Sequence, residues 1–153
     1  MHKQCGVSLI EVLVAIVIVS FGLLGVASVI GNALKNSHSA YGRSQANWLA
    51  NDIIDRMRAN RSEAESPGKP YALSFEDDNC KDDDCEDDAP TGATVAAADL
   101  AAWRAALSAT LPSGTGKIEM NSTTMKVTVT VRWDDSRALN GSSSQTVSVE
   151  TRL

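Results

Sequence analysis

The sequence has few of the residues on which catalytic and metal-binding sites depend. Its 153 residues include only two histidines, three cysteines and four prolines, and 5% of its side chains are aromatic. It contains no Gly-x-Ser-x-Gly motif, no histidine pair and no phosphate-binding glycine loop. Lysine and arginine form no stripe with interleaved aromatic residues. The sequence therefore predicts neither an enzyme nor a nucleic-acid-binding protein.

The dominant feature that is present is an uncharged, largely apolar run from Val12 to Leu34. As an α-helix, its 23 residues would extend about 35 Å, and the hydrocarbon core of a bilayer is about 30 Å thick. A cleaved secretory signal fits less well, because its apolar region is shorter and a small-x-small cleavage site should follow it. The run therefore predicts a retained membrane helix.

A carboxylate stands at the start of this run. A charged side chain at the centre of a membrane helix costs about 3 kcal/mol, and less near an end, so Glu11 is a functional candidate that needs a cationic partner. The segment around it reads Gly6-Val7-Ser8-Leu9-Ile10-Glu11-Val12-Leu13-Val14-Ala15. It resembles the class III signal of type IV prepilins and type II secretion pseudopilins, in which a short basic leader ends in glycine and a glutamate follows five residues into the mature chain.

The resemblance implies a processing step and a role for the carboxylate. A prepilin peptidase would cleave after Gly6, the new amino group of Val7 would be methylated, and the apolar helix would be kept. In a filament, Glu11 would face the amino terminus of a neighbouring subunit. An ion pair at about 4 Å and an effective dielectric constant of about 20 is worth about 4 kcal/mol, enough to set the axial register. The alternative is an ordinary signal anchor.

The resemblance also divides the chain into three parts. Residues 1–6 are a cleaved leader, residues 7–34 are the helix of the membrane and filament core, and residues 35–153 are a globular domain that includes the amphipathic half of the long helix. In residues 35–62, apolar side chains recur every seven or every four positions. Together they predict a core-facing stripe of Leu34, Tyr41, Trp48, Leu49, Ile53 and Met57.

Acidic residues are concentrated in one segment. Residues 76–88 hold nine of the nineteen acidic side chains and one cation, Lys81, so this segment carries −8 and the rest of the chain sums to +3. We expect a solvated loop. The weak calcium candidates are Asp82, Asp84 and Glu86, but the glycine and the distal glutamate of an EF-hand loop are absent. We therefore expect no cofactor and keep calcium as an alternative.

Removal of the leader would take Cys5 away and leave Cys80 and Cys85. Two cysteines in an exported domain predict one disulfide. A zinc site would lack further ligands, because His2 lies in the leader and His38 is the only other histidine.

The remaining sequence predicts one helix and three strands. Asp99 is expected to cap a helix with the apolar face Leu100, Trp103, Leu107 and Leu111, and Trp103 is expected to be a core anchor. Period-two alternation predicts strands at 117–120, 125–133 and 147–153 in meander order. The expected fold class is α+β and pilin-like: a long N-terminal helix packed on a small antiparallel sheet with an extra short helix.

Three later blocks resemble PilV-type minor pilins: Ala50 to Arg61, Asp99 to Gly116, and Trp133-Asp134-Asp135. This resemblance implies a minor pilin of a type IV pilus. It would help to prime assembly at the pilus tip with other minor pilins, the major pilin, a tip adhesin and the inner-membrane assembly platform. The chain would lie in the inner membrane with its globular domain periplasmic, and later in a pilus on the cell surface.

Two other functions stay open at this point. One is a minor pseudopilin of a type II secretion system, which shares the leader and the glutamate. The other is a static membrane-anchored module that binds calcium or a basic partner through the acidic loop.

Overall fold

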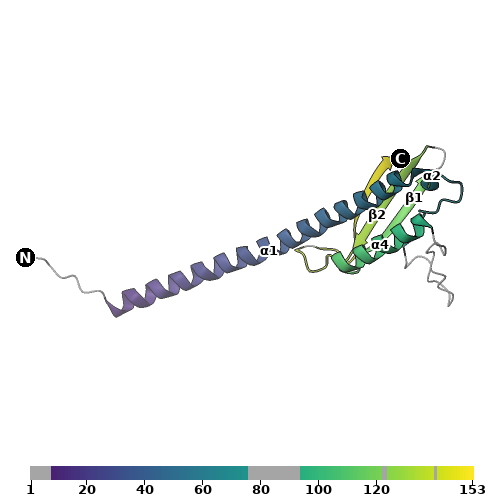
Figure 1. Cartoon of the computed structure of the whole chain (residues 1–153). Helices are drawn as coiled ribbons and strands as arrows, with labels where there is room; N and C mark the ends of the chain where they lie inside the picture. Colours follow the sequence, from purple (N-terminus) through teal and green to yellow (C-terminus); the bar gives the residue numbers. More distant parts are fainter. Residues whose placement is uncertain (1–7, 76–93, 122–123, 140) are drawn as a thin grey trace, which may run out of the picture.

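A computed structural model describes residues 8–75, 94–121, 124–139 and 141–153 of the chain. The elements are the helices α1 (Leu9–Ala59), α2 (Arg61–Ala64) and α4 (Val95–Thr110) and the strands β1 (Thr115–Asn121), β2 (Lys126–Trp133) and β3 (Gln145–Arg152). Figure 1 shows α1 as a long rod whose C-terminal half carries all the other elements. This arrangement confirms the predicted α+β fold, in which a long helix packs on a small antiparallel sheet with an extra short helix.

The sheet is antiparallel, with the strand order β1-β2-β3, which is the predicted meander. Ile118 of β1 lies opposite Val129 of β2, and Val129 lies opposite Val149 of β3. Because side chains alternate along a strand, these apolar positions share one face of the sheet. β1 is longer than the predicted 117–120, since all seven of its residues pair with β2.

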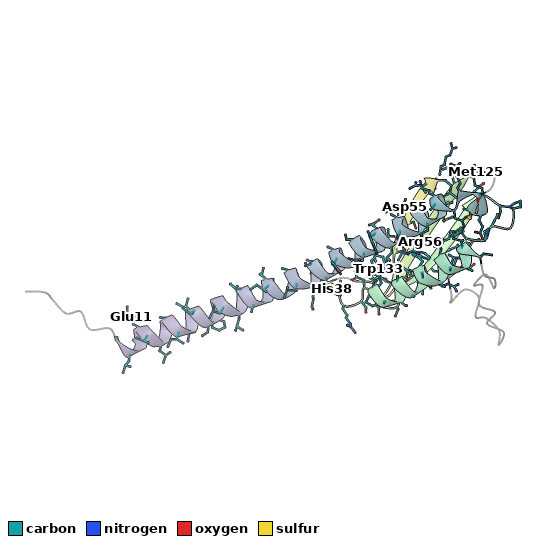
Figure 2. The ribbon with its side chains drawn as sticks, in the orientation of Figure 1. Glu11, His38, Asp55, Arg56, Met125 and Trp133 are labelled. Atoms are coloured by element: carbon teal, nitrogen blue, oxygen red, sulfur yellow. The ribbon has the colours of Figure 1, made fainter. Side chains whose placement is uncertain are left out.

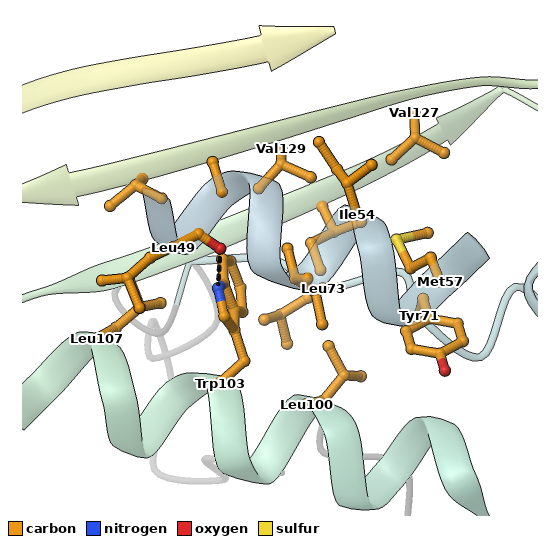
Figure 3. Close-up of a cluster of buried hydrophobic side chains, with 14 of the residues drawn as sticks. Leu49, Ile54, Met57, Tyr71, Leu73, Leu100, Trp103, Leu107, Val127 and Val129 are labelled. Atoms are coloured by element: carbon orange, nitrogen blue, oxygen red, sulfur yellow. Dashed lines mark hydrogen bonds between the residues drawn. The ribbon is translucent and has the colours of Figure 1, made fainter. Parts of the chain in front are cut away.

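The core lies between this face of the sheet, the C-terminal half of α1, and α4. Figure 3 shows α4 below, the sheet above and α1 between them. Trp103 is the central side chain of α4. It is fully buried, and its indole Nε1–H donates a hydrogen bond to the backbone oxygen of Leu49, 2.8 Å away. The expected role of Trp103 as a core anchor is therefore confirmed, and the same contact attaches α4 to α1.

The predicted core-facing stripe on α1 is correct for the side chains at four-residue spacing and wrong for those at seven-residue spacing. Leu49, Ile53 and Met57 are fully buried. The column at seven-residue spacing is exposed instead, with exposed fractions of 66% for Leu34, 60% for Tyr41 and 63% for Trp48. Adjacent helix positions such as 48 and 49 point about 100° apart. The sheet and α4 cover the side of α1 that carries Leu49, which leaves the Trp48 side uncovered within the part of the chain that the structure describes.

The predicted start of the short helix is also wrong. Helix α4 begins at Val95, and its N-cap is Thr94, whose side-chain oxygen accepts a hydrogen bond from the Ala97 amide at 3.2 Å. The run of alanines at positions 96–98 has high helix propensity and extends the helix toward its N-terminus. Asp99 therefore lies inside α4, where its carboxylate makes tertiary contacts.

Further boundaries differ from the prediction, and β3 runs from Gln145 to Arg152 instead of the predicted 147–153. The amphipathic pattern predicts a helix through residue 62, but α1 ends at Ala59, where Asn60 leaves helical geometry. The alternation predicts Met125 as the first residue of the second strand, but β2 begins at Lys126. Met125 has a φ of 54° and is 40% exposed. Local turn geometry overrides the sequence pattern at Asn60 and Met125.

Candidate functional site: the exposed half of α1 and its junction with the domain

The first half of α1 contacts nothing else in the described part of the chain. The first buried residue of the helix is Ala46, although the helix begins at Leu9. The apolar side chains before it are largely exposed, as 72% for Phe21 and 67% for Leu24 illustrate. Within the described ranges this helix is the one segment long and apolar enough to cross a membrane. A helix that is apolar on all sides needs lipid or other helices around it.

Glu11 lies in the first turn of this helix, at the end far from the globular domain, as Figure 2 shows. Its amide donates a hydrogen bond to the Ser8 backbone oxygen at 3.0 Å, and its side chain is exposed. It is the only charged residue between Ser8 and Leu34. The positive end of the helix dipole favours a carboxylate here. The structure thus leaves an accessible anion at the tip of an apolar rod.

The globular domain is attached to α1 by a polar network near the C-terminal end of the helix. The Tyr71 hydroxyl donates to Asp99 Oδ2 at 2.7 Å, and the amide of Asn60 donates to the Tyr71 oxygen at 3.2 Å. Arg56 bridges Asp52 of α1 at 3.0 Å and Asp99 of α4 at 3.4 Å. Burial first, and then the negative charge of Asp99, raise the pKa of Tyr71 to about 12. The network thus links α1, the connecting segment and α4.

We expect Tyr71→Phe to lower the free energy of unfolding by about 1 kcal/mol, because Asn60 and Asp99 each lose a partner. Because the pKa of Tyr71 is higher in the folded than in the unfolded chain, its contribution to the free energy of unfolding is fully present below the ordinary tyrosine pKa of about 10. That contribution should disappear as the pH rises through about 12. Urea unfolding between pH 8 and pH 12 checks both points, since the variant should lose less stability over this range than the unchanged protein. Equal alkaline losses in the two proteins would contradict the assignment.

A second junction lies just beyond the apolar run. The hydroxyl of Ser39 donates to Asp135 Oδ2 at 2.5 Å, and Asp135 is 6% exposed. The indole of Trp133 lies over Gly42, where an added Cβ would stand 3.4 Å from Nε1. Figure 2 shows Trp133 close to the level of His38. These contacts hold the segment between β2 and β3 against the middle of α1. Sequence reasoning missed them because Ser39 and Asp135 are 96 positions apart.

Several predicted site residues lie outside the described residues. They are Gly6 and Val7 at the cleavage position, Cys80 and Cys85 of the predicted disulfide, and the weak calcium candidates Asp82, Asp84 and Glu86. Among the residues that the structure does describe, no group of three or more histidine, cysteine, aspartate or glutamate side chains is placed to hold a metal ion.

Residues 1–27 match the family model described as the prokaryotic N-terminal methylation motif. Searches of curated proteins and of solved structures gave no match. The matched segment contains Gly6, Val7 and Glu11 and the first part of the exposed helix. The motif implies processing by a prepilin peptidase and assembly with other pilins, and it is typical of structural rather than enzymatic proteins. Together with the exposed apolar helix, it supports the assignment of this chain to the type IV pilin and pseudopilin superfamily.

Proposed function

We propose that the chain is a minor pilin of a type IV pilus, similar to PilV-type subunits. In this proposal the prepilin is cleaved after Gly6, methylated at Val7 and held in the inner membrane by residues 7–34. It is then extracted into a filament. The observation that carries the proposal is the single continuous helix Leu9–Ala59, whose first half buries no residue against its own domain. Such a helix can exchange lipid neighbours for the helices of other subunits.

The exposed column on α1 favours a filament subunit over a simple anchor. Trp48 is fourteen residues beyond Leu34, which places it about 21 Å further along the helix axis. That distance exceeds the polar headgroup layer, which is about 5 to 8 Å thick on each side of the hydrocarbon core. Lipid therefore does not account for the 63% exposure of Trp48. A neighbouring helix in a bundle would cover both Trp48 and Tyr41.

Glu11 would set the register of that bundle. The carboxylate is four residues from Val7, whose amino group is freed by cleavage, and it is the only charge in the exposed apolar half. In a bundle of apolar helices, the carboxylate of one subunit can pair with the amino terminus of the next only at one axial offset. A carboxylate left unpaired in such a bundle would be strongly destabilising, which selects that offset.

The remaining parts of the proposal follow the resemblance to PilV-type subunits. The globular domain would be periplasmic before assembly and displayed on a surface pilus afterwards. The partners would be other minor pilins, the major pilin, a tip adhesin and the inner-membrane assembly platform. The subunit would help to prime assembly at the tip and support adhesion or motility. The predicted disulfide between Cys80 and Cys85 would lie in the exported domain.

Mass spectrometry of pili sheared from the cell surface tests the proposal. We expect an N-terminal peptide that begins at Val7 and carries a methyl group on its amino nitrogen. The matched sample is the membrane fraction of a strain without prepilin peptidase, where the peptide should still contain Met1 to Gly6.

The other outcomes point to the alternative functions. A chain cleaved after Gly6 but found only in the membrane would favour a minor pseudopilin of a type II secretion system. A chain that retains Met1 to Gly6 in peptidase-competent cells would refute processing and favour a static membrane-anchored module.

A further inference from the structure

The end of the domain nearest the exposed half of α1 is formed largely by the segment between β2 and β3 (Figure 1). The contacts of Ser39 with Asp135 and of Gly42 with Trp133 hold this segment at a defined height on the helix. Ser39 and Gly42 lie five and eight residues beyond Leu34, so they are about 8 and 12 Å further along the axis.

This height brings the segment to the surface of the bilayer. If the apolar run that ends at Leu34 fills the hydrocarbon core, the next 5 to 8 Å of the helix cross the polar headgroup layer. Ser39 is then at the outer boundary of that layer. Arg137 and Leu139 follow Asp135 by two and four residues, so they lie within reach of the headgroups.

The exposed side chains at this end are those typical of a membrane interface. We call Lys35, His38, Tyr41, Arg137 and Leu139 the collar; all five are exposed. Tyr41 is 60% and Leu139 is 45% exposed. Aromatic and basic side chains are enriched at membrane interfaces, where an apolar body and a polar tip both find a favourable environment.

The cations of the collar are available to a phosphate group. No ion pair among the described residues involves Lys35 or Arg137, and the neighbouring Arg43 has none either. By contrast, the arginines near the C-terminal end of α1 all have carboxylate partners: Arg56, Arg58 and Arg61. Lys35 and Arg43 of α1, and Arg137 of the segment between β2 and β3, therefore have no carboxylate within ion-pair distance among the described residues.

Two carboxylates oppose these cations. Asp135 is nearly buried and accepts the Ser39 hydrogen bond, so it points into the domain. The Ser136 amide donates to Asp134 at 2.8 Å. That hydrogen bond, and to a smaller extent the charge of Arg137, lower the pKa of Asp134. Both carboxylates line a cavity of about 120 Å³ beside His38 and Tyr41. Arg137 also lines this cavity, whereas Lys35 does not. Because the two carboxylates would repel a phosphate inside the cavity, a headgroup phosphate would bind Lys35 and Arg137 from outside it.

We propose that the collar docks on phospholipid headgroups of the bilayer that holds α1, with Lys35 and Arg137 at phosphate groups and Tyr41 and Leu139 at the outer side of the headgroup layer. This inference rests on the membrane insertion of α1 in the proposed function, but not on incorporation into a filament. The contact would fix the tilt of the domain over the membrane, and extraction of the subunit would have to break it.

Photo-crosslinking of the full chain in proteoliposomes tests this proposal. A photoreactive amino acid replaces Leu139, and the same group at Leu23 and at Ser148 provides an inserted and a remote control. The vesicles contain phosphatidylcholine with or without phosphatidylglycerol. We expect lipid adducts at 139 and 23 but not at 148, with more adduct at 139 when phosphatidylglycerol is present.

A charge reversal adds a second criterion. We expect Arg137→Glu to lower the lipid adduct at 139 at least about five-fold in phosphatidylglycerol vesicles, because loss of one basic side chain at an anionic surface already accounts for about that factor and the new carboxylate adds repulsion. The matched variant Arg152→Glu, an exposed cation at the other end of β3, should leave the adduct unchanged. Unchanged thermal unfolding of Arg137→Glu would show that its domain is still folded.

The proposal is overturned if position 23 labels lipid while position 139 does not, or if the adduct at 139 joins a second copy of the chain. It is also overturned if the adduct at 139 is unaffected by Arg137→Glu. Failure of position 23 to label lipid would instead show that α1 is not inserted, which would overturn the membrane step of the proposed function as well.

Discussion

Glu11→Ala is expected to reduce incorporation of the chain into filaments at least ten-fold while leaving its amount in the membrane unchanged. The carboxylate is exposed at the first turn of α1 and is the only charge in the apolar half of the helix. Its pairing with a neighbouring amino terminus would contribute about 4 kcal/mol at an effective dielectric constant of about 20. Without it, the amino terminus of the neighbour would be buried without a partner. Immunoblots of sheared filaments and of membranes measure both quantities.

Two further variants separate charge from shape at this position. Glu11→Gln keeps the size of the side chain and should lose incorporation nearly as fully as Glu11→Ala. Glu119→Gln removes an exposed carboxylate that pairs with Lys117 on the outward face of the sheet, and it should assemble normally. Wild-type incorporation of Glu11→Ala would show that Glu11 does not set the register.

Trp103→Ala is expected to lower the free energy of unfolding by about 3 to 5 kcal/mol, the usual range for a buried tryptophan. Its side chain is fully buried, and the variant also loses the hydrogen bond to the Leu49 backbone oxygen. Urea unfolding of the detergent-solubilised chain, followed by circular dichroism, measures the loss. Trp48→Ala is the matched control. Because Trp48 is 63% exposed, its replacement should change stability by only about 0.5 kcal/mol.

Gly116 offers an independent test of the same contact. A Cβ at this position would overlap the indole ring of Trp103, with Cζ3 at 2.7 Å, and would approach Leu107 Cδ1 to 2.9 Å. Gly116→Ala should therefore cost about 1 to 3 kcal/mol through overpacking. Combination with Trp103→Phe, which removes part of the ring, should cost less than the sum of the single variants. If the losses in the free energy of unfolding simply add, the close approach of Gly116 to Trp103 is not the reason why alanine is unfavourable at position 116.

The types of the main elements were predictable from local pattern. Alternation of apolar and polar side chains through Val127, Val129 and Val131 predicted β2, and the buried pattern of that strand agrees. Spacings of three and four residues predicted the apolar face of α4, including Trp103. Both periods are set by backbone geometry within one element, so no knowledge of the rest of the fold is needed.

Contacts between elements were not predictable in the same way. The sequence assigned Asp99 to a helix cap, whereas its carboxylate accepts a hydrogen bond from Tyr71 and pairs with Arg56. It gave no role to Ser39 and used Asp135 only as part of a block that resembles PilV-type minor pilins, although the two residues meet across 96 positions. Such partners are brought together by chain folding, and a local pattern contains no information about them.

By itself, the sequence determined the apolar helix, the carboxylate at its start, the processing motif and the alternating strands. These features depend on composition and on short-range periodicity. Only the tertiary structure decided which side of α1 is buried. Leu49 and Trp48 are adjacent and both apolar, but the sheet and α4 can cover only one of two directions about 100° apart. The choice of the Leu49 side leaves Trp48 and Tyr41 exposed for other partners, and the collar lies at the end of the domain nearest the exposed apolar half of α1.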